Sequence, residues 1–265
     1  MLEESRNQGP SVVFEGVTKQ YPGGAIAVCG VSVTIAAGSF VALVGSSGSG
    51  KSTLLKMINR LVEPSSGQVL VGDTPVERED VHLLRRRIGY IFQNVGLFPH
   101  FTVAENIAIG LRLGGGTDNR ARVDMLLDLV DLPRDFGTRT PDALSGGQRQ
   151  RVGVARALAT KPGLLIMDEP FGALDPVTRD QLGKAIRRLH DQFGLTTIMV
   201  THDMAEALLL ADRVLVMDAG RIVADCPPRA LIAGEGGPAA DALVAVPREQ
   251  ARRLRALENG IGAGT

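Results

Sequence analysis

The sequence predicts an α/β fold with a mainly parallel sheet and helices on both of its faces. The first observation is a glycine-rich stretch at residues 45–52, which follows an apolar run at 40–44 and precedes the helix-like residues 53–60. The second is that apolar runs and helix-like segments alternate from residue 162 onward. Such alternation is typical of parallel strands joined by crossover helices.

Length and charge narrow the class of protein. The chain has 265 residues, enough for one large domain or two small ones. Its 29 Lys and Arg balance 29 Asp and Glu, so bulk positive charge gives no support for nucleic-acid binding. No run approaches the ~18 consecutive apolar residues of a membrane span, and residues 1–6 lack the pattern of a signal peptide. Cys29 and Cys226 lack metal-ligand spacing, so we expect reduced thiols in a cytosolic protein.

Two strands are expected before the glycine-rich stretch. Residues 11–21 indicate the first, and residues 31–35 alternate apolar with polar side chains as the second. Pro22-Gly23-Gly24 provides a turn between them. Tyr21 ends the first strand, and the sequence leaves two readings open: a ring that stacks on a base, or an ordinary edge-strand aromatic.

The chain after the glycine-rich stretch continues the α/β pattern. A break at 63–67 leads to a strand at 68–73, and a basic helix at 83–87 leads to a strand at 87–92. Gln93 stands at the end of that strand. We therefore expect its side chain at the strand's carboxyl edge.

Residues 94–140 change in character. An apolar, aromatic loop at 95–101 is followed by helical stretches at 103–113 and 120–132. The loop is either a docking surface for a partner or a buried segment. We interpret about 94–158 as a helical insert within the α/β domain.

The C-terminal half has well-marked elements. Asp175 is a cap and Pro176 a first-turn residue for a helix that Gly194 ends. A hairpin turn is expected at 218–221, and residues 230–265 contain one charged helix at 248–257 with loose ends. The expected strands are 164–167, 196–200, 214–217 and 222–224, and the expected helices are 149–158, 176–193 and 203–211.

The stretch at 45–52 matches the phosphate-binding pattern G-x-x-x-x-G-K-[ST]. Glycines let the backbone wrap a polyphosphate, and the following helix N-terminus adds partial positive charge. Lys51 would supply a full charge to the β- and γ-phosphates, and the Ser52 hydroxyl is placed to ligate Mg²⁺. The expected nucleotide-binding residues here are Gly45, Ser46, Ser47, Gly48, Ser49, Gly50, Lys51, Ser52 and Thr53.

A pair of acidic residues follows the apolar run at 164–167. Asp168 could hold Mg²⁺ from the strand tip, and Glu169 is placed to orient or deprotonate an attacking water. Alone, these would be ordinary acidic surface residues. Together with the phosphate loop they predict the second half of a nucleotide-hydrolysing site.

A Ser-Gly-Gly turn lies at the N-terminus of the expected helix at 149–158 and is a second potential anion site. Because one nucleotide has one γ-phosphate, already held by residues 45–52, this surplus suggests that two copies of the chain face each other. The turn comprises Ser145, Gly146, Gly147 and Gln148.

The turn resembles the signature motif of ATP-binding cassette (ABC) ATPases, and the order of motifs over residues 11–230 agrees. The resemblance implies a P-loop NTPase with a RecA-like core, an antiparallel β subdomain and a helical insert, followed by a short C-terminal helical tail at 231–265. It also implies ATP and Mg²⁺ as cofactors and a homodimer that sandwiches two ATP molecules. The implied roles are adenine stacking for Tyr21, the Q-loop for Gln93, a metal site at Ser52, Gln93 and Asp168, the catalytic base for Glu169, the D-loop for residues 173–175 with Asp175, and the switch histidine for His202.

A narrower resemblance concerns cargo. Residues 57–64 and 96–100 are similar to those of importer ATPases for quaternary amines such as glycine betaine, choline and carnitine. It implies a peripheral protein at the cytoplasmic membrane face, bound to permease subunits and served indirectly by a substrate-binding protein. About 35 residues follow residue 230, too few for the paired CBS domains of longer members.

Two alternatives remain open. The cargo could be different, such as an amino acid or phosphate, because no residue here would touch it. A soluble ABC ATPase of repair, translation or cluster assembly is the other class. The short insert, the single cassette and the neutral charge disfavour it.

Overall fold

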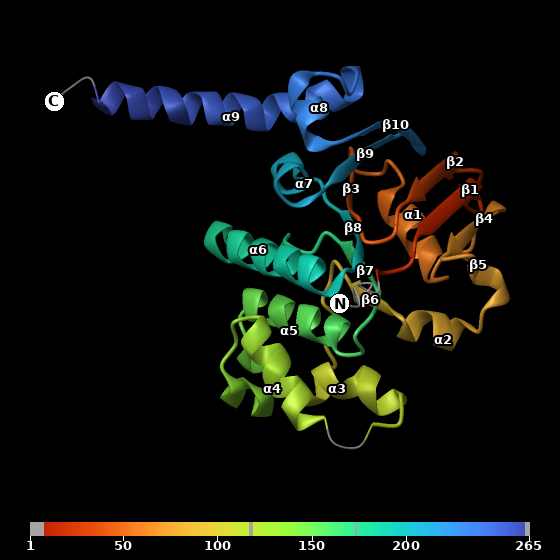
Figure 1. Cartoon of the computed structure of the whole chain (residues 1–265), viewed down its shortest axis with the longest axis vertical. Coiled ribbons are helices and arrows are strands. Elements are labelled where there is room, and N and C mark those ends of the chain that lie inside the picture. The colour runs from red at the N-terminus through yellow and green to blue at the C-terminus, as the bar shows by residue number, and fades with distance from the viewer. Residues whose placement is uncertain (1–7, 117–118, 173, 263–265) are drawn as a thin grey trace, which may run out of the picture.

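The computed structural model describes residues 8–116, 119–172 and 174–262, with side chains described up to residue 257. Two sheets organise this part of the chain (Figure 1). None of the described helices combines the length and the hydropathy that a bilayer crossing requires.

The larger sheet has six strands in the order β10-β9-β3-β8-β7-β6. Neighbouring pairs from β9 to β6 are parallel, and β10 alone pairs antiparallel, through the predicted hairpin. The expectation of a mainly parallel sheet is therefore confirmed. The bounds are β3 Phe40–Val44, β6 Ile88–Ile91, β7 Leu164–Asp168, β8 Thr196–Val200, β9 Arg213–Asp218 and β10 Arg221–Cys226.

Strand β3 is buried on both faces because layers cover the sheet from both sides. Phe40, Ala42 and Val44 join a core built with the helices on one face. Val41 and Leu43 point the other way, into a second core formed with α1 (Lys51–Ile58) and the smaller sheet. This alternation explains why residues 40–44 are uniformly apolar.

The smaller sheet is antiparallel, with strand order β2-β1-β4-β5, as the family resemblance implied. Its long strands, β1 Val12–Gln20 and β2 Ile26–Ile35, pack over α1 beside the larger sheet (Figure 1). The remaining elements are β4 Ser66–Val71, β5 Thr74–Pro75, the 3₁₀ turn η1 Val76–Arg78 and helix α2 Val81–Arg86.

Three helices gather at the end of the molecule opposite the C-terminal region (Figure 1). They are α3 Val103–Leu113, α4 Arg120–Leu129 and α5 Gly146–Leu158, with 3₁₀ turns η2 Arg134–Thr138 and η3 Pro141–Ala143 between α4 and α5. Thr102 and Glu105 form a capping box that begins α3. Helix α4 ends before the predicted residue 132 because Asp131 has a left-handed backbone, with φ of 54°.

Helix α6 (Pro176–Phe193) begins where the Asp175 cap predicts. Asp175 accepts bonds from the backbone N–H groups of Val177 and Thr178 to begin it, and Gly194 ends it with φ of 61°. Helix α7 (Met204–Leu210) begins the same way at Asp203.

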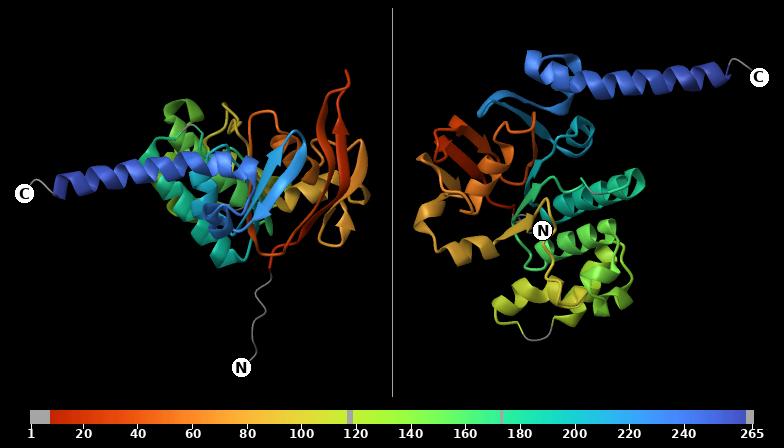
Figure 2. Two further views of the ribbon diagram at one scale, coloured as in Figure 1. Left: turned by 90° about the horizontal axis from the view of Figure 1, so that it is seen from above. Right: turned by 180° about the vertical axis from the view of Figure 1, so that it is seen from behind.

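The expectation for residues 230–265 is wrong. Instead of one helix at 248–257, the structure has α8 (Pro228–Ala233) and a 25-residue α9 (Pro238–Gly262), which extends away from the body (Figure 2). Pro247 lies inside α9, and the helix continues through it. Burial of Ala240 and Val244 and the Ala-, Leu- and Arg-rich sequence stabilise this helix despite the lost N–H donor.

Candidate active site

The phosphate-binding loop joins the carboxyl end of β3 to the first turn of α1. Gly50 is the residue before α1, with φ of 102°, and a Cβ there would lie 2.0 Å from the Ala27 carbonyl oxygen. A Cβ on Gly45 would lie equally close, 2.0 Å, to the Met217 carbonyl oxygen. Only glycine fits these two positions, so packing against two other segments fixes the shape of the loop.

Lys51 is buried inside this loop. Its ammonium donates to the carbonyl oxygens of Gly45 and Ser46 at 2.9 and 2.8 Å, and to the Ser49 hydroxyl at 3.3 Å. Burial lowers the pKa of Lys51, while the nearby charges of Glu169 and Asp168 raise it. The loop therefore holds a cation within a ring of backbone groups, which suits a phosphate ligand.

Ser52 and Asp168 meet, although 116 residues separate them in the sequence. The Ser52 hydroxyl donates to Asp168 Oδ1 at 2.7 Å, and the Asp168 side chain is only 2% exposed. A hydroxyl and a carboxylate side by side are oxygen donors of the kind that Mg²⁺ prefers. These two residues therefore fit the predicted metal site.

A second cluster surrounds Glu169. Gln93 Nε2 donates to Glu169 Oε2 at 2.9 Å, and His202 Nδ1 lies 3.6 Å from the same oxygen. Glu169 has a left-handed backbone, with φ of 48°, and its N–H donates to Val200 O at 2.9 Å. A non-glycine residue held in this conformation at a strand end is typical of a functional site. The third predicted metal residue, Gln93, thus bonds to Glu169 rather than to Ser52 or Asp168.

Sheet topology explains why these groups converge. Strands β3, β8, β7 and β6 are parallel neighbours, so their carboxyl ends lie at one edge. Residues that follow β6, β7 and β8 provide Gln93, Glu169 and His202, and the loop after β3 provides Lys51 and Ser52.

The Ser-Gly-Gly turn lies at the start of α5, as predicted. The Ser145 hydroxyl accepts from Gln148 N at 3.3 Å, and Gln148 Oε1 accepts from Ser145 N at 2.9 Å. Ser145 is exposed. Within the described ranges, no hydrogen bond or ion pair joins residues 145–148 to residues 45–53 of the same chain.

The structure places two further predicted residues at the surface. Tyr21 directly follows β1, is 39% exposed, and has the Lys19 ammonium 5.3 Å from its ring centroid. Asp175 is the exposed cap of α6. Ala173 of the predicted D-loop lies outside the described residues.

Two residues near Asp168 were not predicted from the sequence. Lys56 Nζ lies 3.4 Å from Asp168 Oδ2. The Tyr90 hydroxyl is buried without a hydrogen-bond partner in the described part of the chain, and burial, followed by the Asp168 charge, raises its pKa. The four-residue spacing from Ser52 to Lys56 on α1 is a helical-face signal that could have predicted the first contact.

The sequence model described as "ABC transporter" matches residues 28–172. The chain is 50% identical over 212 residues to the carnitine transport ATP-binding protein OpuCA of Listeria monocytogenes serotype 1/2a (strain 10403S), covering 79% of this chain and 53% of that protein. It is also 49% identical over 219 residues to the sulfate/thiosulfate import ATP-binding protein CysA of Synechococcus elongatus, covering 82% and 62%.

Among solved structures, one similar to this chain is the dimeric post-hydrolysis state of the ATP-binding cassette MJ0796 bound to ADP and Pi. The TM-score is 0.77 at 33% identity, and the match covers 82% of this chain and 99% of that one. The chain spans about half the length of the first relative, at 53%.

Proposed function

Since this chain belongs to the ABC transporter family, we propose that it binds and hydrolyses ATP with Mg²⁺ and so drives transport through a separate permease. The observation that supports this most is the meeting of two clusters at one sheet edge. Ser52 bonds to Asp168 at 2.7 Å, and the next residue, Glu169, is bonded to Gln93 at 2.9 Å. The residues that would hold Mg²⁺ and the carboxylate that would activate water are therefore adjacent.

We assign the phosphate contacts to the loop at 45–53. Lys51 would exchange its bonds to Gly45 and Ser46 for phosphate oxygens, which are stronger acceptors than backbone carbonyls. Ser52 and Asp168 would hold Mg²⁺, which neutralises charge on the phosphates when bound. The exposed ring of Tyr21 is our candidate for the adenine base.

We assign the water chemistry to the Glu169 cluster. The carboxylate would accept a proton from the attacking water, and Gln93 would orient that carboxylate through its 2.9 Å bond. His202 is 66% exposed, so its ring can reach a γ-phosphate beyond Glu169.

We further propose that two copies form the working unit. The exposed Ser145 turn, with Gly146, Gly147 and Gln148, makes no bond to its own chain's phosphate loop. A helix N-terminus of this kind favours an anion, and the γ-phosphate held by a second copy would supply one. Asp175 would lie at the same junction.

The permease is expected to dock on the loop at 95–101, at the cytoplasmic face of the membrane. Phe98 is 48% exposed, and its ring centroid lies 5.3 Å from that of Phe101. Leu97, by contrast, packs against the core, so the loop is partly docking surface and partly buried. Asn106 fixes the loop by donating to the carbonyl oxygens of Phe98 and Phe101.

Phe98→Asp should therefore reduce co-purification with the permease by about tenfold or more, since an exposed aromatic anchor typically contributes over ~1.4 kcal/mol. The fold should be unaffected because Asn106 contacts only the backbone at Phe98. Leu209→Asp is the control, since Leu209 on α7 is an apolar side chain that is 80% exposed. Undiminished permease recovery with the first variant would contradict the docking assignment.

For cargo we propose a quaternary amine such as carnitine, choline or glycine betaine. Support comes from residues 57–64 and 96–100 and from the carnitine-transport relative. The 49% identity to a sulfate importer keeps an oxyanion as the competing candidate. ATPase activity of the complex with its permease and binding protein in vesicles should rise with carnitine or betaine. A response to sulfate or phosphate alone would assign a different cargo.

A further inference from the structure

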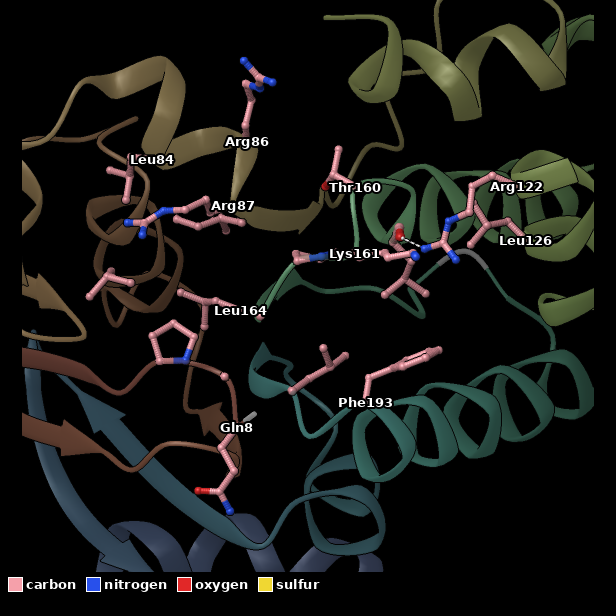
Figure 3. Close-up of a pocket in the computed structure, with 18 of the residues that line it drawn as sticks. Gln8, Leu84, Arg86, Arg87, Arg122, Leu126, Thr160, Lys161, Leu164 and Phe193 are labelled. Carbon is pink, nitrogen blue, oxygen red and sulfur yellow. Dashed lines mark hydrogen bonds between the residues drawn. The ribbon is translucent and has the colours of Figure 1, made fainter. Parts of the chain in front are cut away.

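A cavity of about 790 Å³ lies at the edge of the larger sheet opposite the nucleotide site (Figure 3). Ile88 and Leu164, the first residues of parallel strands β6 and β7, line it, whereas Asp168 is the last residue of β7. Helices α2 and α4 and the end of α6 complete its walls. Nothing in the ATPase mechanism uses this space.

The lining combines an apolar surface with positive charge. Leu84, Leu126 and Phe193 contribute apolar wall, and four cations line the same cavity: Arg86, Arg87, Arg122 and Lys161. No Asp or Glu is among the described lining residues, although acids and bases are equal in number over the whole chain. The charged side chains that line the cavity are therefore all positive, which favours an anionic ligand.

These cations differ in their partners. Arg87 pairs with Glu79 at 2.6 Å. Among the described residues, Arg122 donates only to the carbonyl oxygens of Leu158 and Ala159 and to the Met125 sulfur, and burial lowers its pKa. The Lys161 ammonium makes no hydrogen bond or ion pair with any described residue, and Figure 3 shows it between Arg87 and Arg122. No carboxylate of the described residues therefore neutralises Lys161 or Arg122.

We propose that this cavity binds a small amphiphilic anion, with its phosphate or carboxylate head at Lys161 and Arg122 and its apolar body against Leu84, Leu126 and Phe193. Its volume lies within the range of about 300–1,000 Å³ that is usual for small-molecule sites. An anion gains charge-assisted bonds there, and an apolar tail covers exposed hydrocarbon surface. The site is independent of ATP hydrolysis and stands whether or not the proposed function holds.

Anilinonaphthalene sulfonate, a fluorescent aromatic anion, is a suitable probe, titrated into the full chain without nucleotide. Lys161→Asn should raise its dissociation constant by about fivefold, the effect expected for loss of one charged contact. Asparagine suits this position because Lys161 has a left-handed backbone, with φ of 54°. Arg255→Asn, at an exposed position on α9, is the matched control and should bind the probe as the parent chain does.

Competition defines the ligand class. Octyl phosphate or octanoate should displace the probe, whereas octanol, inorganic phosphate and octyltrimethylammonium should do so at least about tenfold less well, because each lacks the head or the tail or has the wrong charge. Equal displacement by octyltrimethylammonium would overturn the charge assignment. Unchanged probe affinity in Lys161→Asn, or no saturable binding by the parent chain, would overturn the site.

Discussion

Glu169→Gln should abolish steady-state ATP hydrolysis, lowering the rate by about 10²–10⁴-fold, the usual contribution of a general base. The amide has nearly the same shape as the carboxylate but cannot accept a proton. Its oxygen can still accept the Gln93 bond, which is 2.9 Å long in the parent chain, so the cluster should keep its geometry. ATP affinity, which depends on Lys51 and the loop amides, should remain within about twofold, since only contacts outside the loop change.

The matched control is Glu63→Gln, an exposed carboxylate that should leave turnover unchanged. With ATP bound and hydrolysis blocked, the Glu169 variant should also accumulate as a dimer in size-exclusion chromatography. Turnover near that of the parent chain would remove Glu169 from its assigned role.

Lys51→Ala should lose both ATP affinity and turnover. Charged hydrogen bonds contribute about 1.5–3 kcal/mol, so affinity measured with a fluorescent ATP analogue should fall by about tenfold or more. In the parent chain Lys51 is only 6% exposed, and its ammonium is bonded to Gly45, Ser46 and Ser49. Its loss also leaves those loop acceptors without a donor.

Lys184→Ala is the control, because Lys184 is 71% exposed and pairs with Asp180 on the surface of α6. A thermal melt of both variants separates loss of the site from loss of the fold. If Lys51→Ala bound the analogue as tightly as the parent chain, the phosphate role of Lys51 would be rejected.

Patterns with a local physical cause were predicted well from the sequence. The loop at 45–52 needs glycine conformations, Asp175 and Ser145 are helix caps, and residues 164–167 are apolar because both sheet faces are covered. Each of these signals is short in range. The alternation of strands and helices predicted the parallel sheet, whereas the roles of Gln93 and His202 were implied by the ABC resemblance.

The features that were not predicted from the sequence depend on long-range packing. No local signal shows that α9 continues through Pro247, since its stabilisation includes burial of Ala240 and Val244 against other elements. The position of Tyr90 near Asp168 also depends on the pairing of β6 with β7. The charged cavity beneath these strands is formed by segments far apart in the chain, so no motif predicted it.

The central claim is that each ATP is held between the phosphate loop of one copy and the Ser145 turn of another. Cysteine cross-linking tests it in the Glu169→Gln background, with Cys29 and Cys226 replaced by serine. One batch of chain carries Ser46→Cys and the other Gly147→Cys. Ser46 is exposed, and a Cβ at Gly147 would lie no closer than 3.4 Å to its neighbours, so both positions accept the change.

Mixing the two batches with ATP and a mild oxidant should give a covalent dimer on a non-reducing gel. Neither batch alone should give it, and neither should the mixture without ATP. The contradicting result is a mixture that forms the ATP-trapped dimer in size-exclusion chromatography yet shows no cross-link that depends on ATP.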